Sequence, residues 1–298
     1  MRVFVIGATG YVGSAVVAAL RNRGDAVVGS ARTEAAATKL RDGGIEAALC
    51  DVTAPESLRA PARGCDAVVY AVQYNGADVA AMESAALDSI VNALAGSGNA
   101  LLYTSGYWVY GNTGDRVAAE DSPLDPIALI AYRPGLERIV LDGVQRSVRA
   151  IVIRPGVVYG KGAGIPAMWA RSAKEEGAAR FVGDGRNRWA MIHRDDLAQL
   201  YVLALERAGP GAIYNAGDET SFTVREMAEA AAAGAGKNGA VTSWPLEEAR
   251  GALGAFADAL TVDSRITAQR ARKELGWGPR SATILDDLKR GSYSLPES

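Results

Sequence analysis

Three glycines near the start of the chain have the spacing of a dinucleotide-binding turn. Gly7, Gly10 and Gly13 follow the apolar run Arg2–Ile6 and open a segment with apolar side chains at helical spacing. A strand, a glycine turn and a helix in this order aim backbone N–H groups and the positive end of the helix dipole at a phosphate. Glycine suits this turn because it is tight and the backbone must approach the pyrophosphate closely. The sequence therefore predicts a dinucleotide site at residues 7–13; the alternative is an ordinary glycine turn.

The end of the second expected strand indicates which dinucleotide binds. NAD sites usually carry an acidic residue there, on the ribose 2′-hydroxyl, whereas this strand ends Ser30-Ala31-Arg32. The Arg32 guanidinium can hold a 2′-phosphate through paired hydrogen bonds, and the Ser30 hydroxyl can add another. We therefore expect NADPH; the alternative is that Arg32 is a solvated loop residue. Asp51 and Val52 follow the third strand, where an adenine amino group would be read, although Asp51 also suits a helix N-terminus.

Short apolar runs alternate with helical stretches through the first half of the chain. The expected strands are 3–6, 26–30, 47–50, 67–70, 101–104 and 150–154. The expected helices lie near 10–22, 35–41, 55–62, 79–95 and 131–146. This alternation predicts an α/β fold, a Rossmann-type doubly wound parallel sheet with helices on both faces.

After Arg154 the pattern becomes irregular and rich in glycine, which predicts a smaller C-terminal substrate lobe over the carboxyl edge of the sheet. We expect residues 1–155 to form the dinucleotide-binding domain, with 184–216 returning to it. Residues 156–183 and 217–298 would then form the substrate lobe.

Composition excludes several classes of protein. The net charge is −2 and the Lys and Arg residues are scattered, so nucleic acid is not an expected partner. No apolar run approaches the ~20 residues of a membrane span. The chain enters a strand without a signal peptide and has two cysteines, which fits a cytoplasmic protein. One histidine and no cluster of ligands argue against a metal site.

Further motifs along nearly the whole chain resemble the extended short-chain dehydrogenase/reductases, the NAD-dependent epimerase/dehydratase group. They are Gly7–Gly13, Asp51, Ala71, Val109–Gly111, Arg154–Gly160, Ile192–Asp196, Tyr214–Gly217 and Leu275–Trp277. The resemblance implies that the cofactor is contacted by Gly7, Thr9, Gly10, Tyr11, Val12, Gly13, Arg32, Asp51, Val52, Ala71, Val72, Gln73, Thr104, Arg133, Pro155, Val157 and Val158. It also implies a homodimer through the helices near 79–95 and 131–146.

The chain departs from the catalytic pattern of that family. Reductases of the family use a Ser or Thr, and a Tyr and Lys four residues apart on one helix. The phenol protonates a carbonyl oxygen while the Lys lowers the phenol pKa and holds the nicotinamide ribose. By resemblance, Leu129 takes the tyrosine place, Arg133 the lysine place and Gly106 the serine place. Arg133 would still hold the ribose, but it stays protonated and cannot relay a proton.

Four residues are therefore candidates for catalysis: Ser105, Tyr107, Tyr132 and Arg133. Tyr107 is either the proton donor or a pocket wall, and Tyr132 is either catalytic or a packing residue. Ser105 either donates to the substrate or only ends a strand. The single histidine, His193, precedes a helix that we expect an aspartate at 195 or 196 to cap.

Arginines and tryptophans gather in the second lobe. Arg171, Arg186 and Arg188, with Trp169 and Trp189, suit an acidic or aromatic substrate, or lie on a solvated surface.

The sequence leaves three functions open. The first is an NADPH-dependent reductase of a carbonyl or similar unsaturated centre in a small metabolite. The second is a nucleotide-sugar epimerase or dehydratase, or an isomerase, with a recycled or structural cofactor. The third is a non-catalytic dinucleotide-sensing regulator. Fold alone does not choose among them.

Overall fold

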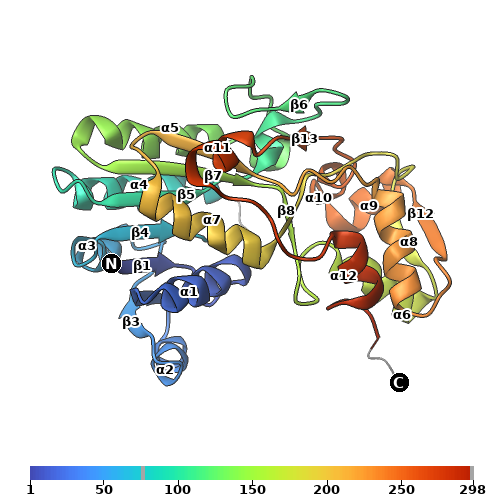
Figure 1. The fold of residues 1–298 in the computed structure, drawn as a ribbon, viewed down its shortest axis with the longest axis horizontal. Coiled ribbons are helices and arrows are strands. Elements are labelled where there is room, and N and C mark those ends of the chain that lie inside the picture. The colour runs from blue at the N-terminus through green and yellow to red at the C-terminus, as the bar shows by residue number, and fades with distance from the viewer. Residues whose placement is uncertain (75–77, 296–298) are drawn as a thin grey trace.

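A seven-stranded sheet, parallel throughout, forms the centre of the computed structural model, which describes residues 1–74 and 78–295. The strand order is β11-β7-β5-β4-β1-β2-β3. The strands are β1 (Arg2–Ile6), β2 (Ala26–Ala31), β3 (Glu46–Leu49), β4 (Ala67–Tyr70), β5 (Ala100–Thr104), β7 (Arg149–Pro155) and β11 (Ala212–Ala216). The order reverses beside β1, so the expected doubly wound α/β fold is confirmed, with the sheet on the left in Figure 1.

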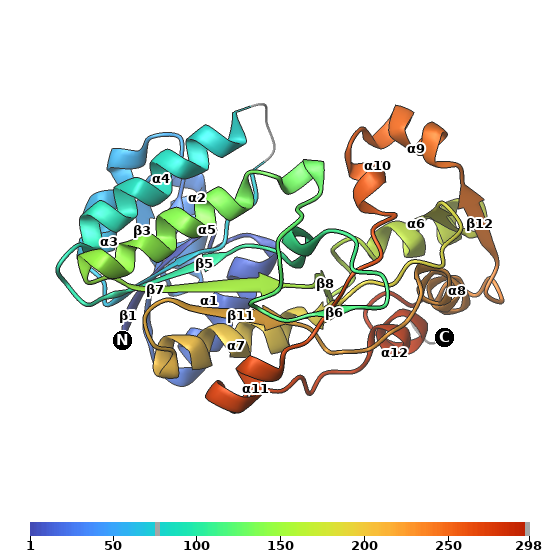
Figure 2. The same cartoon turned by 90° about the horizontal axis from the view of Figure 1, so that it is seen from above.

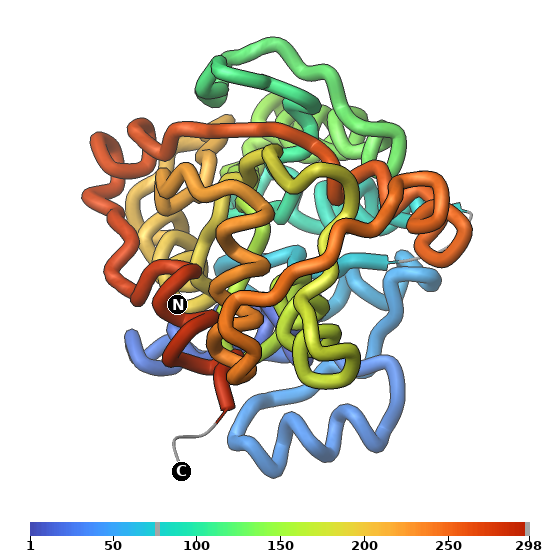
Figure 3. The backbone as a smooth tube through the Cα atoms, turned by 90° about the vertical axis from the view of Figure 1, so that its right-hand side faces the viewer, coloured from blue at the N-terminus to red at the C-terminus, as the bar shows by residue number. Residues whose placement is uncertain are grey.

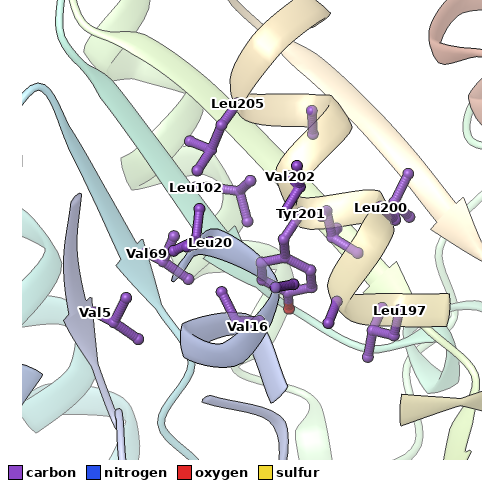
Figure 4. Packing of buried hydrophobic residues seen from close by; sticks show 14 of the residues in the cluster. Val5, Val16, Leu20, Val69, Leu102, Leu197, Leu200, Tyr201, Val202 and Leu205 are labelled. Carbon is purple, nitrogen blue, oxygen red and sulfur yellow. The ribbon is translucent and has the colours of Figure 1, made fainter. Parts of the chain in front are cut away.

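Helices cover both faces because the strand side chains alternate between two apolar surfaces. Val3 and Val5 belong to one core cluster, and Phe4 and Ile6 to another. The first face carries α1 (Tyr11–Arg23), α2 (Glu34–Asp42), α7 (Arg194–Arg207) and α11 (Gln269–Leu275). The second carries α3 (Arg59–Arg63), α4 (Val79–Leu94) and α5 (Arg133–Asp142). Figure 2 shows the sheet between these layers, and Figure 4 shows α1 and α7 side chains packing over β1, β4 and β5.

Two expected helices are shorter in the structure. The stretch near 131–146 contains α5, preceded by the 3₁₀ turn Ala128–Ile130 and followed by the 3₁₀ turn Gly143–Arg146. Pro134 lies at the start of α5, where its fixed φ suits the first turn and its missing N–H costs nothing. The stretch near 55–62 begins as the 3₁₀ turn Pro55–Leu58 before α3.

A smaller lobe with its own core continues from β7. It contains β8 (Val157–Tyr159), α6 (Ala167–Glu176), β9 (Ala179–Val182), β10 (Met191–His193), α8 (Val224–Gly234), β12 (Val241–Trp244), α9 (Leu246–Leu253), α10 (Phe256–Ala259) and α12 (Ile284–Arg290). β8 pairs with β10, and β9 with β12. Two further short strands, β6 (Val117–Ala118) and β13 (Arg265–Ile266), pair with each other. In Figure 3 the lobe faces the viewer, and α12 lies against α8.

The chain passes between the sheet domain and the smaller lobe more than once. α7 and β11, within the range 184–216, lie in the sheet layer. α11 lies in the range that we expect to form the lobe, but it packs against α7 and β11. The reason is its apolar face, since Ala271 and Leu275 join the sheet-side core. The expected domain boundaries stay a prediction.

α4 and α5 pack against each other and against the sheet. Burial within the monomer therefore accounts for part of their apolar faces, and the homodimer stays a prediction. Among the helices of the described residues, none combines the length and apolar character needed to cross a bilayer. The cytoplasmic location likewise stays a prediction.

Candidate functional site

The glycine turn has the close contacts that exclude side chains. Gly7 has φ of 89°, and a Cβ there would stand 2.6 Å from the Ala71 carbonyl oxygen. A Cβ on Gly13 would overlap the Gly7 carbonyl oxygen. Gly10 N–H donates to the same carbonyl at 2.8 Å and closes the turn. The glycines are therefore required by the turn itself, at the carboxyl ends of β1 and β4.

The N-terminus of α1 leaves donors for an anion. Gly10 is the N-cap residue, and no side chain caps the helix. The first helical hydrogen bond runs from Ser14 N–H to the Gly10 carbonyl. The N–H groups of Tyr11, Val12 and Gly13 therefore have no helical partner, and the first turn has no acidic residue. This cradle fits the pyrophosphate of a dinucleotide. Within it, Thr9 is exposed and Tyr11 is half-buried.

The tip of β2 holds two residues that we expect near a 2′-phosphate. Ser30 Oγ accepts a hydrogen bond from Gly7 N–H at 3.0 Å, so this side chain ties β2 to the glycine turn. Arg32 is exposed, and within residues 1–74 and 78–295 it makes no ion pair or hydrogen bond. The Arg32 guanidinium is therefore open to solvent, and its role in binding a 2′-phosphate stays a prediction.

Asp51 closes a short turn after β3. Its Oδ1 accepts from Thr53 N–H at 2.9 Å, and its own N–H donates to Ser57 Oγ at 3.0 Å. Val52 is buried beside it. The side chain therefore already caps a turn, and adenine recognition stays a prediction. Of the residues that follow β4, Ala71 and Val72 are half-buried and Gln73 is exposed.

Thr104 is held firmly at the carboxyl end of β5. Its Oγ1 donates to the Tyr70 carbonyl at 2.7 Å and lies 2.6 Å from the Tyr201 hydroxyl. Its carbonyl accepts from Arg133 Nη1 at 2.9 Å. These contacts fix the end of β5, from which Ser105 and the residues after it leave the sheet.

Three polar atoms on the residues after Thr104 are buried without hydrogen-bond partners, although Trp108 as a whole is half-buried. Ser105 Oγ, Tyr107 Oη and Trp108 Nε1 make no hydrogen bond within the part of the chain that the structure describes. Tyr107 is 3% exposed, and burial raises the pKa of its phenol, against a smaller opposing effect of the Trp108 indole. The phenol is thus protonated at neutral pH. Buried polar groups are normally paired, so this segment is a place where a ligand would supply the partners.

The residues in the family's tyrosine and serine places carry no acid–base group. Leu129 lies in the 3₁₀ turn before α5 and is exposed, and Gly106 precedes Tyr107. Arg133 is 6% exposed, and its Nη1 also lies 3.4 Å from the Tyr103 hydroxyl. Tyr132 is half-buried, and the Arg133 guanidinium carbon lies 5.8 Å from its ring centre. Tyr132 therefore packs against the sheet-side cluster, whereas Tyr107 belongs to the lobe core. Arg133 contacts the end of β5 through the Thr104 carbonyl.

One charged residue near Arg133 escapes the sequence analysis. Glu83, on α4, is fully buried, and neither carboxylate oxygen has a hydrogen-bond partner among the described residues. Burial raises its pKa to about 7, and Arg133 opposes the shift. The sequence does contain a signal for the burial of Glu83. This residue lies at helical spacing from the apolar residues Leu87 and Ile90 and so interrupts an apolar stripe.

A buried network explains several motifs of the family resemblance. Arg154 donates to both oxygens of Glu137, at 3.0 and 2.6 Å, and to the Tyr110 hydroxyl at 2.7 Å. Tyr110 in turn donates to Asn215 Oδ1 at 2.8 Å. These hydrogen bonds connect α5, β7 and β11.

The segment expected beside the nicotinamide follows this network. Pro155 and Val157 are buried, and Val158 is half-buried. Val157 N–H donates to the Ala190 carbonyl at 2.7 Å. A Cβ on Gly156 would overlap that carbonyl. The segment is thus fixed against the strand that enters the lobe.

His193 caps α7, and the expectation that Asp195 or Asp196 does so is wrong. His193 Nδ1 accepts from Asp195 N–H at 3.2 Å. Asp196 points elsewhere and accepts from the N–H groups of Arg280 and Ser281, each at 3.0 Å. The histidine takes the cap because β10 places it, and not the aspartates, one residue before the helix.

Comparison with known proteins gives this geometry a context. The sequence model of the NAD dependent epimerase/dehydratase family matches residues 3–217. The chain is 32% identical over 304 residues to an uncharacterized protein of Saccharomyces cerevisiae, covering 99% of this chain and 100% of that one. It is 26% identical over 334 residues to the 2-alkyl-3-oxoalkanoate reductase of Stenotrophomonas maltophilia, covering 97% and 98%. The solved dTDP-glucose 4,6-dehydratase of Bacillus anthracis, in complex with NAD, matches with a TM-score of 0.82 at 19% identity, covering 98% and 95%.

Proposed function

The chain belongs to the NAD dependent epimerase/dehydratase family, and on that premise we propose that it is an NADPH-dependent reductase. Its substrate would be a carbonyl or similar unsaturated centre in a small metabolite. A nicotinamide dinucleotide fits the uncapped glycine turn, and the NADP form is the finer part of the proposal. A reductase among the relatives supports this choice.

The observation that carries the proposal is the run of partnerless buried groups after β5. Ser105, Tyr107 and Trp108 follow the carboxyl end of β5, the edge of the sheet at which doubly wound folds bind their ligands. Epimerases of the family depend on the Tyr and Lys that this chain replaces by Leu129 and Arg133. Their replacement therefore counts more against epimerisation than against a reduction with another proton donor.

Residues of the chain would bind the cofactor and transfer the proton. When bound, NADPH supplies a hydride to the carbonyl carbon. The N–H groups of residues 11–13 hold the pyrophosphate, and Arg133 holds the ribose from the edge of β5. Tyr107 Oη gives its proton to the carbonyl oxygen, and solvent restores that proton afterwards. Burial keeps the phenol protonated between turnovers.

Arg32 supports NADPH over NADH. Its exposed guanidinium stands at the tip of β2, where a 2′-phosphate would lie, and the strand end offers no carboxylate to a ribose hydroxyl. Ser30 contributes indirectly, because its hydroxyl fixes the glycine turn.

The test is consumption of NADPH, followed by absorbance, with a panel of small carbonyl compounds. Tyr107→Phe removes only the phenol oxygen, and we expect turnover to fall about 100-fold or more with NADPH affinity unchanged. Tyr214→Phe is the matched control, because this tyrosine is also buried and its hydroxyl bonds Glu274 at 2.9 Å in the sheet layer.

Other results of this assay would support a different proton donor or a different function. Unchanged turnover in Tyr107→Phe would exclude that residue as the acid. Product formed without net loss of NADPH would favour a recycled cofactor, as in an epimerase or dehydratase. Binding of NADPH with no reaction, together with a protein partner, would favour a regulator.

A further inference from the structure

Two tyrosines from opposite ends of the chain bind the polar backbone atoms of Gly160. The Tyr11 hydroxyl donates to the Gly160 carbonyl at 2.6 Å, and the Gly160 N–H donates to the Tyr293 hydroxyl at 2.8 Å. Tyr293 uses its own proton on the Ala163 carbonyl, at 2.6 Å. Burial raises the pKa of Tyr293 to about 12 and also raises the pKa of Tyr11, so both hydroxyls keep their protons at neutral pH.

The backbone at Gly160 depends on the Tyr293 hydroxyl. Gly160 is buried with φ of 112°, and a Cβ there would stand 2.5 Å from His193 Nε2. Within residues 1–74 and 78–295, the hydrogen-bond partner of its N–H is Tyr293. Removal of the hydroxyl would leave a buried N–H unpaired, which is unfavourable. Tyr293, itself 2% exposed, therefore stabilises this conformation.

The segment after α12 holds the same loop at a second point. Gly162 N–H donates to Ser292 Oγ at 2.9 Å. Ser292 is in turn bound by Asp287 of α12, whose carboxylate accepts from the Ser292 N–H at 2.7 Å and from its hydroxyl at 3.0 Å. The position of residues 160–163 is thus set by Ser292 and Tyr293 together.

Gly160 lies between two segments that we expect to contact the cofactor. Directly before it runs β8, with Val157 and Val158, which we expect beside the nicotinamide. On its other side it accepts from Tyr11, the first residue of α1, whose N–H belongs to the pyrophosphate cradle. The bond between Tyr11 and Gly160 therefore connects the cradle to the strand that we expect at the other end of the cofactor.

We propose that Tyr293 is a positioning residue of the dinucleotide site: it holds Gly160, Gly160 holds the Tyr11 side chain, and the glycine turn and β8 thereby keep the spacing that the cofactor requires. The inference rests on the proposed function in one respect, namely that a nicotinamide dinucleotide binds the glycine turn. It adds the C-terminal segment to the residues that determine cofactor affinity. A site that is already ordered binds more tightly, because less freedom is lost on binding.

Tyr293→Phe tests the proposal, because it keeps the ring and removes one oxygen. Dissociation constants for NADPH and NADH are measured on the full chain by nicotinamide fluorescence. We expect both constants to rise about 3- to 10-fold, and by the same factor, since the two dinucleotides share the pyrophosphate and the nicotinamide.

A control separates positioning from stability. Tyr214→Phe also removes a hydroxyl from a buried tyrosine, but its bond to Glu274 lies in the sheet layer. Thermal unfolding followed by circular dichroism gives Tm for each variant. We expect both variants to have a lower Tm and only Tyr293→Phe to bind the dinucleotides more weakly. A merely structural role of Tyr293 would lower Tm and leave both dissociation constants unchanged.

A double-variant cycle tests whether the two tyrosines act through the same loop. Tyr11→Phe keeps the ring and the backbone N–H, and it should weaken NADPH binding by a similar factor. Tyr11→Phe/Tyr293→Phe should weaken binding by less than the product of the two single factors, because either change alone already breaks the connection through Gly160.

Failure of the inference differs from failure of the function. NADPH bound equally by wild type and Tyr293→Phe, equal weakening in Tyr214→Phe, or single factors that multiply in the double variant would each overturn the inference alone. If Tyr293→Phe does not fold, Ser292→Ala removes the second contact to the loop, and unchanged affinity in that variant overturns the inference. Wild-type protein that binds neither dinucleotide overturns the proposed function and the inference with it.

Discussion

Arg133 at the start of α5 donates from Nη1 to the backbone carbonyl of Thr104 at 2.9 Å. Thr104 is the last residue of β5, so this bond fixes the first turn of α5 to the carboxyl edge of the sheet. The cation is thereby anchored before any ligand binds. It also stands near the buried Glu83, whose pKa it lowers against the effect of burial.

We expect Arg133→Met to lower the free energy of unfolding by about 1–3 kcal/mol. The variant loses the bond to Thr104 and the positive charge near Glu83. Urea unfolding at pH 8 measures the effect, and the double variant Arg133→Met/Glu83→Gln is the control. It should lose less than the sum of the single losses, because no buried carboxylate then lacks a cation. Strictly additive losses would show that the two side chains do not interact.

Glu83 makes stability depend on pH. Its folded pKa, about 7, exceeds the ordinary value of 4.5, so between these values the folded protein binds more protons than the unfolded chain. The free energy of unfolding from this group therefore falls as pH rises from 4.5 to 7, by about 3 kcal/mol in all. Glu83→Gln should remove this dependence and be more stable than wild type at pH 8.

Denaturation midpoints at pH 5, 6, 7 and 8 test this expectation. The groups around the carboxylate are Arg133 and the tyrosines 70, 103 and 132, whose phenols stay protonated in this range because burial raises the pKa of each. Parallel pH profiles for wild type and Glu83→Gln would contradict the assignment.

Gly13→Ala should abolish dinucleotide binding and destabilise the fold. The added Cβ would overlap the Gly7 carbonyl oxygen, and both atoms belong to the backbone-fixed turn. Gly135→Ala is the matched control, since this helical glycine of α5 has open space around its Cβ position. The control should gain about 0.5–1 kcal/mol from helix propensity. Equal binding of NADPH by Gly13→Ala and wild type would remove the glycine turn from the site.

Arg32→Ala should weaken NADPH binding by about 10- to 100-fold and leave NADH binding unchanged. The reason is that a charge-assisted contact to the 2′-phosphate exists only with NADPH. Titrations followed by nicotinamide fluorescence measure both affinities. Arg63→Ala, which removes an exposed arginine at the end of α3, controls for the change in net charge. Tighter binding of NADH than NADPH by wild type would reverse the assignment of the cofactor.

The fold was predictable because its signals are local. Alternating apolar runs and helical stretches give the strands and helices of a parallel sheet, and the glycine spacing gives the turn after β1. Gly7 and Gly13 meet each other within that single turn, so their requirement is visible in a few residues. The helix expected near 131–146 begins at Arg133 in the structure, because Pro134 favours the first turn of a helix.

Other features depend on which distant residues meet, and only the tertiary structure decided them. Ser30 is held by Gly7 across two strands, and His193 outcompetes the aspartates as the α7 cap because β10 sets the entry to the helix. Glu83 becomes a buried, partnerless acid only when α4 packs on the sheet beside Arg133. The Trp169–Trp189 stack likewise exists only once α6 meets the segment before β10. Sequence periodicity encodes which face of an element is apolar, whereas burial of a polar group depends on the opposing surface, which the local sequence does not contain.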